Sequence, residues 1–107
     1  MVKQYNFSAK DAFNSIAGET MQSHQGETFT IVGAAIDERP DENGEVRKVG
    51  LLVAEDGTVF TGISDTAIRG IDVLIDTLEE SNGQPMDIMF EGRQAKSGRT
   101  FIVLKLV

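Results

Sequence analysis

One long helix is predicted by residues 64–83, which read SDTAIRGIDVLIDTLEESNG. Ser64 is a residue type that caps helix N-termini, and Ile63 and Ile68 hold the two positions of a hydrophobic staple across that cap. Asn82-Gly83 supplies the stop, because these residue types adopt the left-handed backbone that ends helices. Between cap and stop, apolar side chains recur every three or four residues: Ala67, Ile68, Ile71, Leu74, Ile75 and Leu78. We therefore expect an amphipathic helix with one buried stripe and a mainly acidic outer face.

Five strands are predicted around this helix, three before it and two after it. Their residues are β-branched or alternately apolar, and they are separated by the helix or by the turn pairs Asn43-Gly44, Asp56-Gly57 and Ser97-Gly98. The predicted strands cover residues 28–38, 46–54, 58–63, 86–93 and 99–107. Three strands, a helix and two strands follow one another in a five-stranded OB-like barrel, where the helix closes one end. The expected fold class is α+β, mainly β.

The N-terminal residues precede this pattern. Ser8 is the expected N-cap of a short helix, with Asp11 as an acidic capping-box partner, and apolar residues at helical spacing continue to Gly18. Residues 18–27 have no periodic pattern, so we expect a long loop there. With 107 residues, 40% of them hydrophobic, the chain fits one domain over residues 1–107. Residues 1–26 would be its N-terminal extension of helix and loop.

Several kinds of chemistry have no support in the sequence. There is no cysteine, so neither a disulfide nor a thiolate metal site can form, and His24 is the only histidine. No phosphate-binding loop motif is present, and no carboxylate pair is marked as catalytic. We expect a protein that is not an enzyme and needs no cofactor or metal. The apolar runs are too short to span a bilayer, and no signal peptide is recognisable, so we expect an intracellular protein without membrane contact.

Strand alternation suggests which side chains face outward. In the last strand Ile102, Leu104 and Leu106 share one face and would fill the core, which leaves Phe101 on the other face near cations. There Phe101 would suit base stacking, although packing in the core is the alternative. In the second strand we expect the core set to be Val49, Leu51 and Val53. The third strand then turns Phe60 outward, as a second candidate for stacking.

The cations are unevenly placed. The net charge of −7 disfavours a protein that binds polyanions by bulk attraction. Six of the ten cations nevertheless flank two hairpin loops, three at each: Arg39, Arg47 and Lys48, and then Arg93, Lys96 and Arg99. In OB folds the corresponding two loops frame the nucleic-acid cleft. A solvated surface is the alternative interpretation for any single cation.

Two stretches carry a family resemblance. Residues 49–66, VGLLVAEDGTVFTGISDT, and residues 95–106, AKSGRTFIVLKL, resemble the small single-stranded DNA-binding proteins of tailed phages that use protein-primed replication. The shared features are an Asp-Gly turn, a short aromatic strand, an Ile-Ser-x-Thr helix cap and a closing hairpin. The resemblance covers residues 49–107. It implies sequence-independent binding and protection of single-stranded DNA during phage DNA replication, in the cytoplasm of the bacterial host and without a cofactor.

These observations predict a nucleic-acid-binding surface, with single-stranded DNA as the partner and with a second copy or replication proteins as further partners. Phe60 and Phe101 would stack on bases. The predicted phosphate contacts are Arg39, Arg47, Lys48, Arg93, Lys96, Arg99 and Lys105. The alternative is a non-enzymatic protein–protein interaction module that docks through its acidic surface, which the net charge favours; a small enzyme ranks below both.

Overall fold

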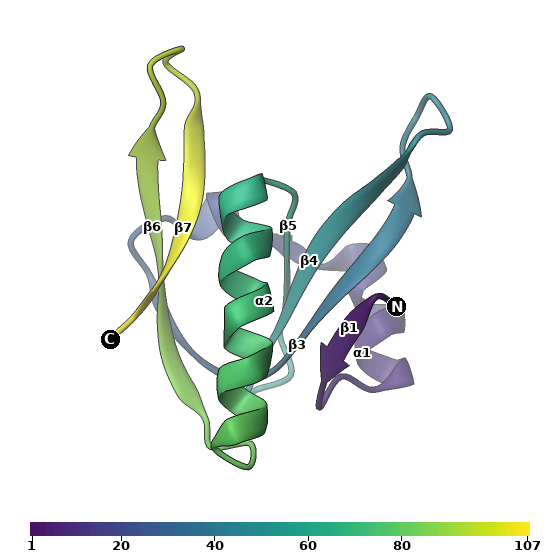
Figure 1. The fold of residues 1–107 in the computed structure, drawn as a ribbon, viewed down its shortest axis with the longest axis vertical. Helices are drawn as coiled ribbons and strands as arrows, with labels where there is room; N and C mark the ends of the chain where they lie inside the picture. The colour runs from purple at the N-terminus through teal and green to yellow at the C-terminus, as the bar shows by residue number, and fades with distance from the viewer.

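The computed structural model describes residues 1–107 and folds them into one curled sheet with two α-helices (Figure 1). The elements follow the chain as β1 (Lys3–Tyr5), α1 (Ala9–Asn14), the 3₁₀ turn η1 (Ser15–Ala17), β2 (Glu19–Thr20), the 3₁₀ turn η2 (Met21–His24), β3 (Thr28–Pro40), β4 (Val46–Ala54), β5 (Val59–Gly62), α2 (Asp65–Glu80), β6 (Met86–Gln94) and β7 (Thr100–Leu106). The predicted succession of three strands, a helix and two strands is therefore present from β3 to β7.

The sheet has the strand order β2-β5-β4-β3-β6-β7, and β1 pairs with β3 outside this path. All pairs are antiparallel except β2 with β5. Strand β3 changes partner along its length, because Thr28–Ile31 pairs with β6, whereas the rest beyond a bulge at Ile31/Gly33 pairs with β4. The bend curls the sheet into a half-barrel. Its two long hairpins separate as two arms: the first arm is residues 37–49 of β3–β4, and the second arm is residues 91–103 of β6–β7 (Figure 1).

Helix α2 lies in the concave face of the half-barrel, with its first turn between the bases of the two arms (Figure 1). The Ser64 hydroxyl accepts a hydrogen bond from the Ala67 N–H at 3.2 Å, which confirms the predicted cap. The predicted stop is also confirmed, since Asn82 and Gly83 both have positive φ. The helix buries five side chains of the predicted stripe: Ala67, Ile71, Leu74, Ile75 and Leu78. The predicted staple is wrong, because Ile63 is 76% exposed.

Phe7 and the helix α1 that follows it cover the face of the sheet opposite α2. Ser8 and Asp11 form the predicted capping box of α1, and the Phe7 side chain just before it is buried. A small second core results, made of Phe7, Ala35, Leu51, Val53 and Val59. Residues 1–26 are thus integrated into the fold through β1 and Phe7.

This second core corrects the expected orientation of β4 and β5. Leu51 and Val53 were expected in the main core, but they face the N-terminal segment, and Leu52 and Phe60 point into the half-barrel instead. The two are register partners across β4 and β5, so they share one face of the sheet. Because both faces of β4 are buried, its apolar run is continuous and alternation does not reveal which face is the larger core.

Residues 19–27, which lie within the expected loop 18–27, form a strap that connects β5 with β6. At one end Glu19 and Thr20 pair in parallel with β5. At the other end the Gly26 N–H donates to the Phe90 carbonyl at 2.7 Å, and the Phe90 N–H donates to the Glu27 carbonyl at 3.1 Å. Between them Met21 is buried in the main core. The strap therefore spans the seam between β5 and β6, where no regular strand pairing exists.

Candidate nucleic-acid interface

A cleft of about 700 Å³ is lined by residues of both arms and of the first turn of α2. The first arm contributes Arg47, and the second arm contributes Arg99 and Phe101. Gln22 of the strap and Ile63, just before α2, complete the part of the lining that matters here. Three of the predicted site residues, from two hairpins far apart in sequence, therefore meet in one cavity.

Phe101 offers a partly accessible aromatic ring in this cleft. Its neighbour Ile102 is only 4% exposed and packs in the main core, so alternation along β7 turns Phe101 away from that core. Phe101 is half-buried and belongs to neither core cluster. Its register partner on β6 is Arg93. The ring thus lies beside a cation, as the sequence predicts, and its use in stacking stays a prediction.

Phe60 does not belong to the interface. Its side chain is fully buried, with ring centroids of Phe29 at 4.5 Å and Phe90 at 5.1 Å. His24 of the strap covers the same cluster, edge-on to Phe60 at 5.4 Å. A base cannot reach the Phe60 ring in this arrangement, so its prediction as a stacking residue is wrong. The cause is the inverted orientation of β4 and β5 described above.

In the first arm, nearby carboxylates neutralise Arg47. Its Nε donates to Asp41 Oδ2 at 2.7 Å, and its Nη2 donates to Glu45 Oε2 at 3.2 Å. The hydrogen bond from Arg47 holds the pKa of Asp41 below its ordinary value of 3.8, helped by the N–H groups of Asn43 and Glu45. Lys48 is exposed and has no ion-pair partner. Only one of these two exposed cations is thus free of a carboxylate.

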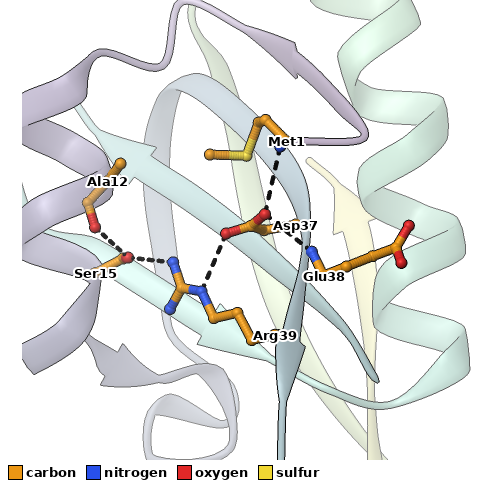
Figure 2. Close-up of polar contacts among 6 residues, drawn as sticks. All are labelled: Met1, Ala12, Ser15, Asp37, Glu38 and Arg39. Atoms are coloured by element: carbon orange, nitrogen blue, oxygen red, sulfur yellow. Dashed lines mark hydrogen bonds and ion pairs between the residues drawn. The ribbon is translucent and has the colours of Figure 1, made fainter. Parts of the chain in front are cut away.

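Arg39, the third cation of the first arm, ties the N-terminal segment to β3 (Figure 2). Its Nε donates to Asp37 Oδ2 at 3.1 Å, and its Nη2 donates to Ser15 Oγ at 2.7 Å. Ser15 in turn donates to the Ala12 carbonyl at 2.6 Å, and the Met1 ammonium lies 3.6 Å from Asp37. Burial alone would raise the pKa of Asp37, but the hydrogen bonds from Arg39 and the following N–H outweigh it and lower the pKa. This network gives Arg39 a structural role, with its guanidinium already engaged.

The second arm holds the less neutralised cations. Lys96 lies in its turn and Arg99 directly before the return strand β7, and both are exposed without an ion-pair partner. Arg93 donates to Glu91 at 3.2 Å on the same strand. Lys105 follows Phe101 on the same face of β7, exposed and unpaired, beyond the arm itself. Lys96, Arg99 and Lys105 are therefore available to an anionic partner.

Two residues near the cleft, Arg69 and Ile63, were not predicted as binding residues. A groove of about 750 Å³ lies between the first arm and α2, and Arg69 and Lys48 line it. Arg69 lies on the helix whose outer face was expected to be mainly acidic; the signal that could have singled it out is that it is the only cation among the residues of α2. Ile63 lines both the cleft and the groove. Because Ile63 was expected to pack in a hydrophobic staple, it was not predicted to be exposed.

The structure has no group of three His, Cys, Asp or Glu side chains placed to hold a metal ion. None of its helices combines the length and the apolar character needed to cross a membrane.

Fold and site together define a small α+β protein with an open cleft whose walls carry cations and one accessible aromatic ring. Over residues 2–107 the chain matches the family described as phage single-stranded DNA-binding protein, and it belongs to that family. The match includes the N-terminal residues, which the resemblance over residues 49–107 had left out. No curated protein and no solved structure matches the chain. The family connects the chain with single-stranded DNA in phage replication, and it is defined by binding rather than by catalysis.

Proposed function

We propose that this protein binds single-stranded DNA through the cleft, without sequence preference, and protects it during phage DNA replication in the cytoplasm of the bacterial host. The family match over nearly the whole chain carries this proposal. The cleft adds a physical route, because it brings Phe101 together with Arg99 although the whole chain has a net charge of −7. DNA binding would thus be concentrated at one local surface, the cleft.

The contacts available in the cleft suit any base. A ring such as Phe101 can stack on the face of every base, and cations such as Lys96, Arg99 and Lys105 meet phosphates, which are the same at every position. Neither contact recognises the hydrogen-bonding edges of a base. A duplex would present its bases already stacked, so Phe101 would gain little from it. Preference for single strands and indifference to sequence follow from the same two kinds of contact.

We also propose that β3, β4, β5, β6 and β7 are the five strands of an OB-like barrel. The element order and the pairing of β3 with both β4 and β6 support this assignment. In such a barrel the loops β3–β4 and β6–β7 frame the nucleic-acid site. A crystal structure with bound oligonucleotide would test this assignment. A DNA strand bound away from these two loops would contradict the position of the site that the barrel implies.

Fluorescence anisotropy with a labelled oligo-dT strand tests the proposed function. At low salt we expect binding of oligo-dT, similar binding of a mixed-sequence strand and much weaker binding of the matching duplex. The affinity should fall as salt rises, by about 0.7 in logarithmic slope for each phosphate contact. Equal affinity for duplex, or no binding of single strands, would contradict the proposal. Slower nuclease digestion of the bound strand would test the protective role.

A stable complex with a replication protein, found together with no DNA binding, would instead favour an interaction module that docks through the acidic surface.

A further inference from the structure

The groove beside α2 is a second basic hollow next to the cleft. It lies between the first arm and the helix and has about the same volume as the cleft, about 750 Å³ against about 700 Å³. Four cations line it, Arg39, Arg47, Lys48 and Arg69, against two carboxylates, Asp41 and Asp65. In a chain whose net charge is −7, this excess of cations is the opposite of the average surface. The groove is therefore a place where an anionic ligand is favoured.

Two of the four cations are free to meet such a ligand. Arg39 is hydrogen-bonded to Asp37 and Ser15, and Arg47 to Asp41 and Glu45. The side chains of Lys48 and Arg69 form no ion pair and no hydrogen bond within the chain, and both residues are exposed. The available charge of the groove is thus carried by Lys48 on one wall and Arg69 on the other.

The cleft and the groove are continuous across the head of α2. Arg47, Ile63 and Asp65 line both. Ile63 is 76% exposed at this junction, so it presents an aliphatic surface instead of packing into the fold. Asp65 lies beside it as the acidic exception. A single strand crossing here would meet the apolar side chain with a base or sugar and keep its phosphates away from Asp65.

We infer that the groove is a second segment of the DNA-binding surface, which takes the continuation of the same single strand. The strand leaves the cleft, crosses Ile63, and places phosphates at Lys48 and Arg69. This inference rests on the proposed function, since it extends a strand already bound at Phe101. It adds Ile63 and Arg69 as binding residues and makes the length of the strand decisive, because only a strand longer than the cleft can occupy the groove.

Strand length therefore provides the test. We would titrate the full-length protein with labelled oligo-dT of roughly 4 and roughly 16 nucleotides, the limits of site size for one OB-type module. The variants are Arg69→Gln and Ile63→Gln. The matched control is Lys10→Gln, which removes one exposed, unpaired cation of α1 that lines neither hollow.

We expect Arg69→Gln to weaken binding of the long strand and to reduce its salt slope by about 0.7, the loss of one phosphate contact, while binding of the short strand is unchanged. Ile63→Gln should also affect the long strand more than the short one. The same loss at both lengths, or no loss beyond that of Lys10→Gln, overturns the inference and leaves the proposed function standing. If the unaltered protein binds neither length, the proposed function fails and the inference fails with it.

Discussion

The two arms carry the same number of cations, yet they differ in how much of that charge a ligand can reach. In the first arm Asp37 engages Arg39, and Asp41 and Glu45 engage Arg47, which leaves Lys48 unpaired. In the second arm only Arg93 has a carboxylate partner, Glu91. The second arm also carries Phe101. A count of cations is therefore a poor measure of an anion-binding surface, because local carboxylates decide which charges are available.

The largest expected effect falls on the second arm. Phe101→Ala should weaken single-strand binding by about 1–3 kcal/mol, the usual contribution of one stacked base, and should do so for any sequence. Because Phe101 belongs to neither core, the free energy of unfolding should change little. Anisotropy titrations and urea unfolding measure the two effects. Phe13→Ala is the matched control, since Phe13 is 74% exposed on α1 and lines neither hollow. Equal losses from both variants would remove the special role of the second arm.

The next effect compares one arginine from each arm. Arg99→Gln should reduce the salt slope of binding by about 0.7, because an unpaired cation is free to release counterions from a phosphate. Arg47→Gln should reduce it less, because Arg47 already has carboxylate partners at 2.7 and 3.2 Å. Titrations over a range of salt concentrations provide both slopes. A larger change for Arg47→Gln would reverse the comparison of the arms.

One change in the first arm is expected to strengthen DNA binding. Removing the two carboxylates that hold Arg47, with Asp41→Asn and Glu45→Gln together, should strengthen single-strand binding because the guanidinium becomes available. Exposed ion pairs contribute at most about 1 kcal/mol, so the gain should be modest. Glu55→Gln together with Asp56→Asn controls for the loss of two negative charges, since both residues lie exposed in another turn and line neither hollow. An affinity that stays at the level of this control would mean that the carboxylates do not limit Arg47.

The smallest effect concerns the strap that connects β5 with β6. His24 lies between Glu19 at 2.9 Å and Glu27 at 2.8 Å, and the hydrogen bonds to these carboxylates raise its pKa above the ordinary 6.5. A raised histidine pKa stabilises the fold fully below the unfolded-state value, and this contribution is lost as pH rises through the folded-state value. Urea unfolding should therefore show lower stability at about pH 8.5 than at about pH 6. His24→Gln should flatten that dependence, and an unchanged profile would contradict it.

The sequence predicted the elements whose determinants are local. The caps at Ser8 and Ser64, the stop at Asn82-Gly83 and the hairpin turns depend on residues close together in the chain, and they are found as expected. From the predicted site, the structure brings Arg47, Arg99 and Phe101 to one cleft. Local chemistry and hairpin topology were sufficient for that much.

The errors arose where distant segments decide the outcome. The sequence analysis wrongly placed Phe60 on the outer face of the sheet. Strand alternation cannot show that Phe7 covers the opposite face. The strap was expected to be a loop because its residues have no periodic pattern. It is held in place by long-range backbone pairing to β5 and Phe90. The engagement of Arg39 depends on Ser15, twenty-four positions earlier in the chain. Such pairings require the folded chain.

The strap also sets an order of events. Its residues precede every strand that it joins, so they leave the ribosome well before β5 and Phe90 exist. The Gly26 bond to Phe90 can form only after most of the chain has been made, and its long loop must first lose conformational freedom. The seam between β5 and β6 can therefore close only late in the synthesis of the chain. Until then Met21 has no completed interior to enter, and the unfinished half-barrel leaves its apolar lining open to water.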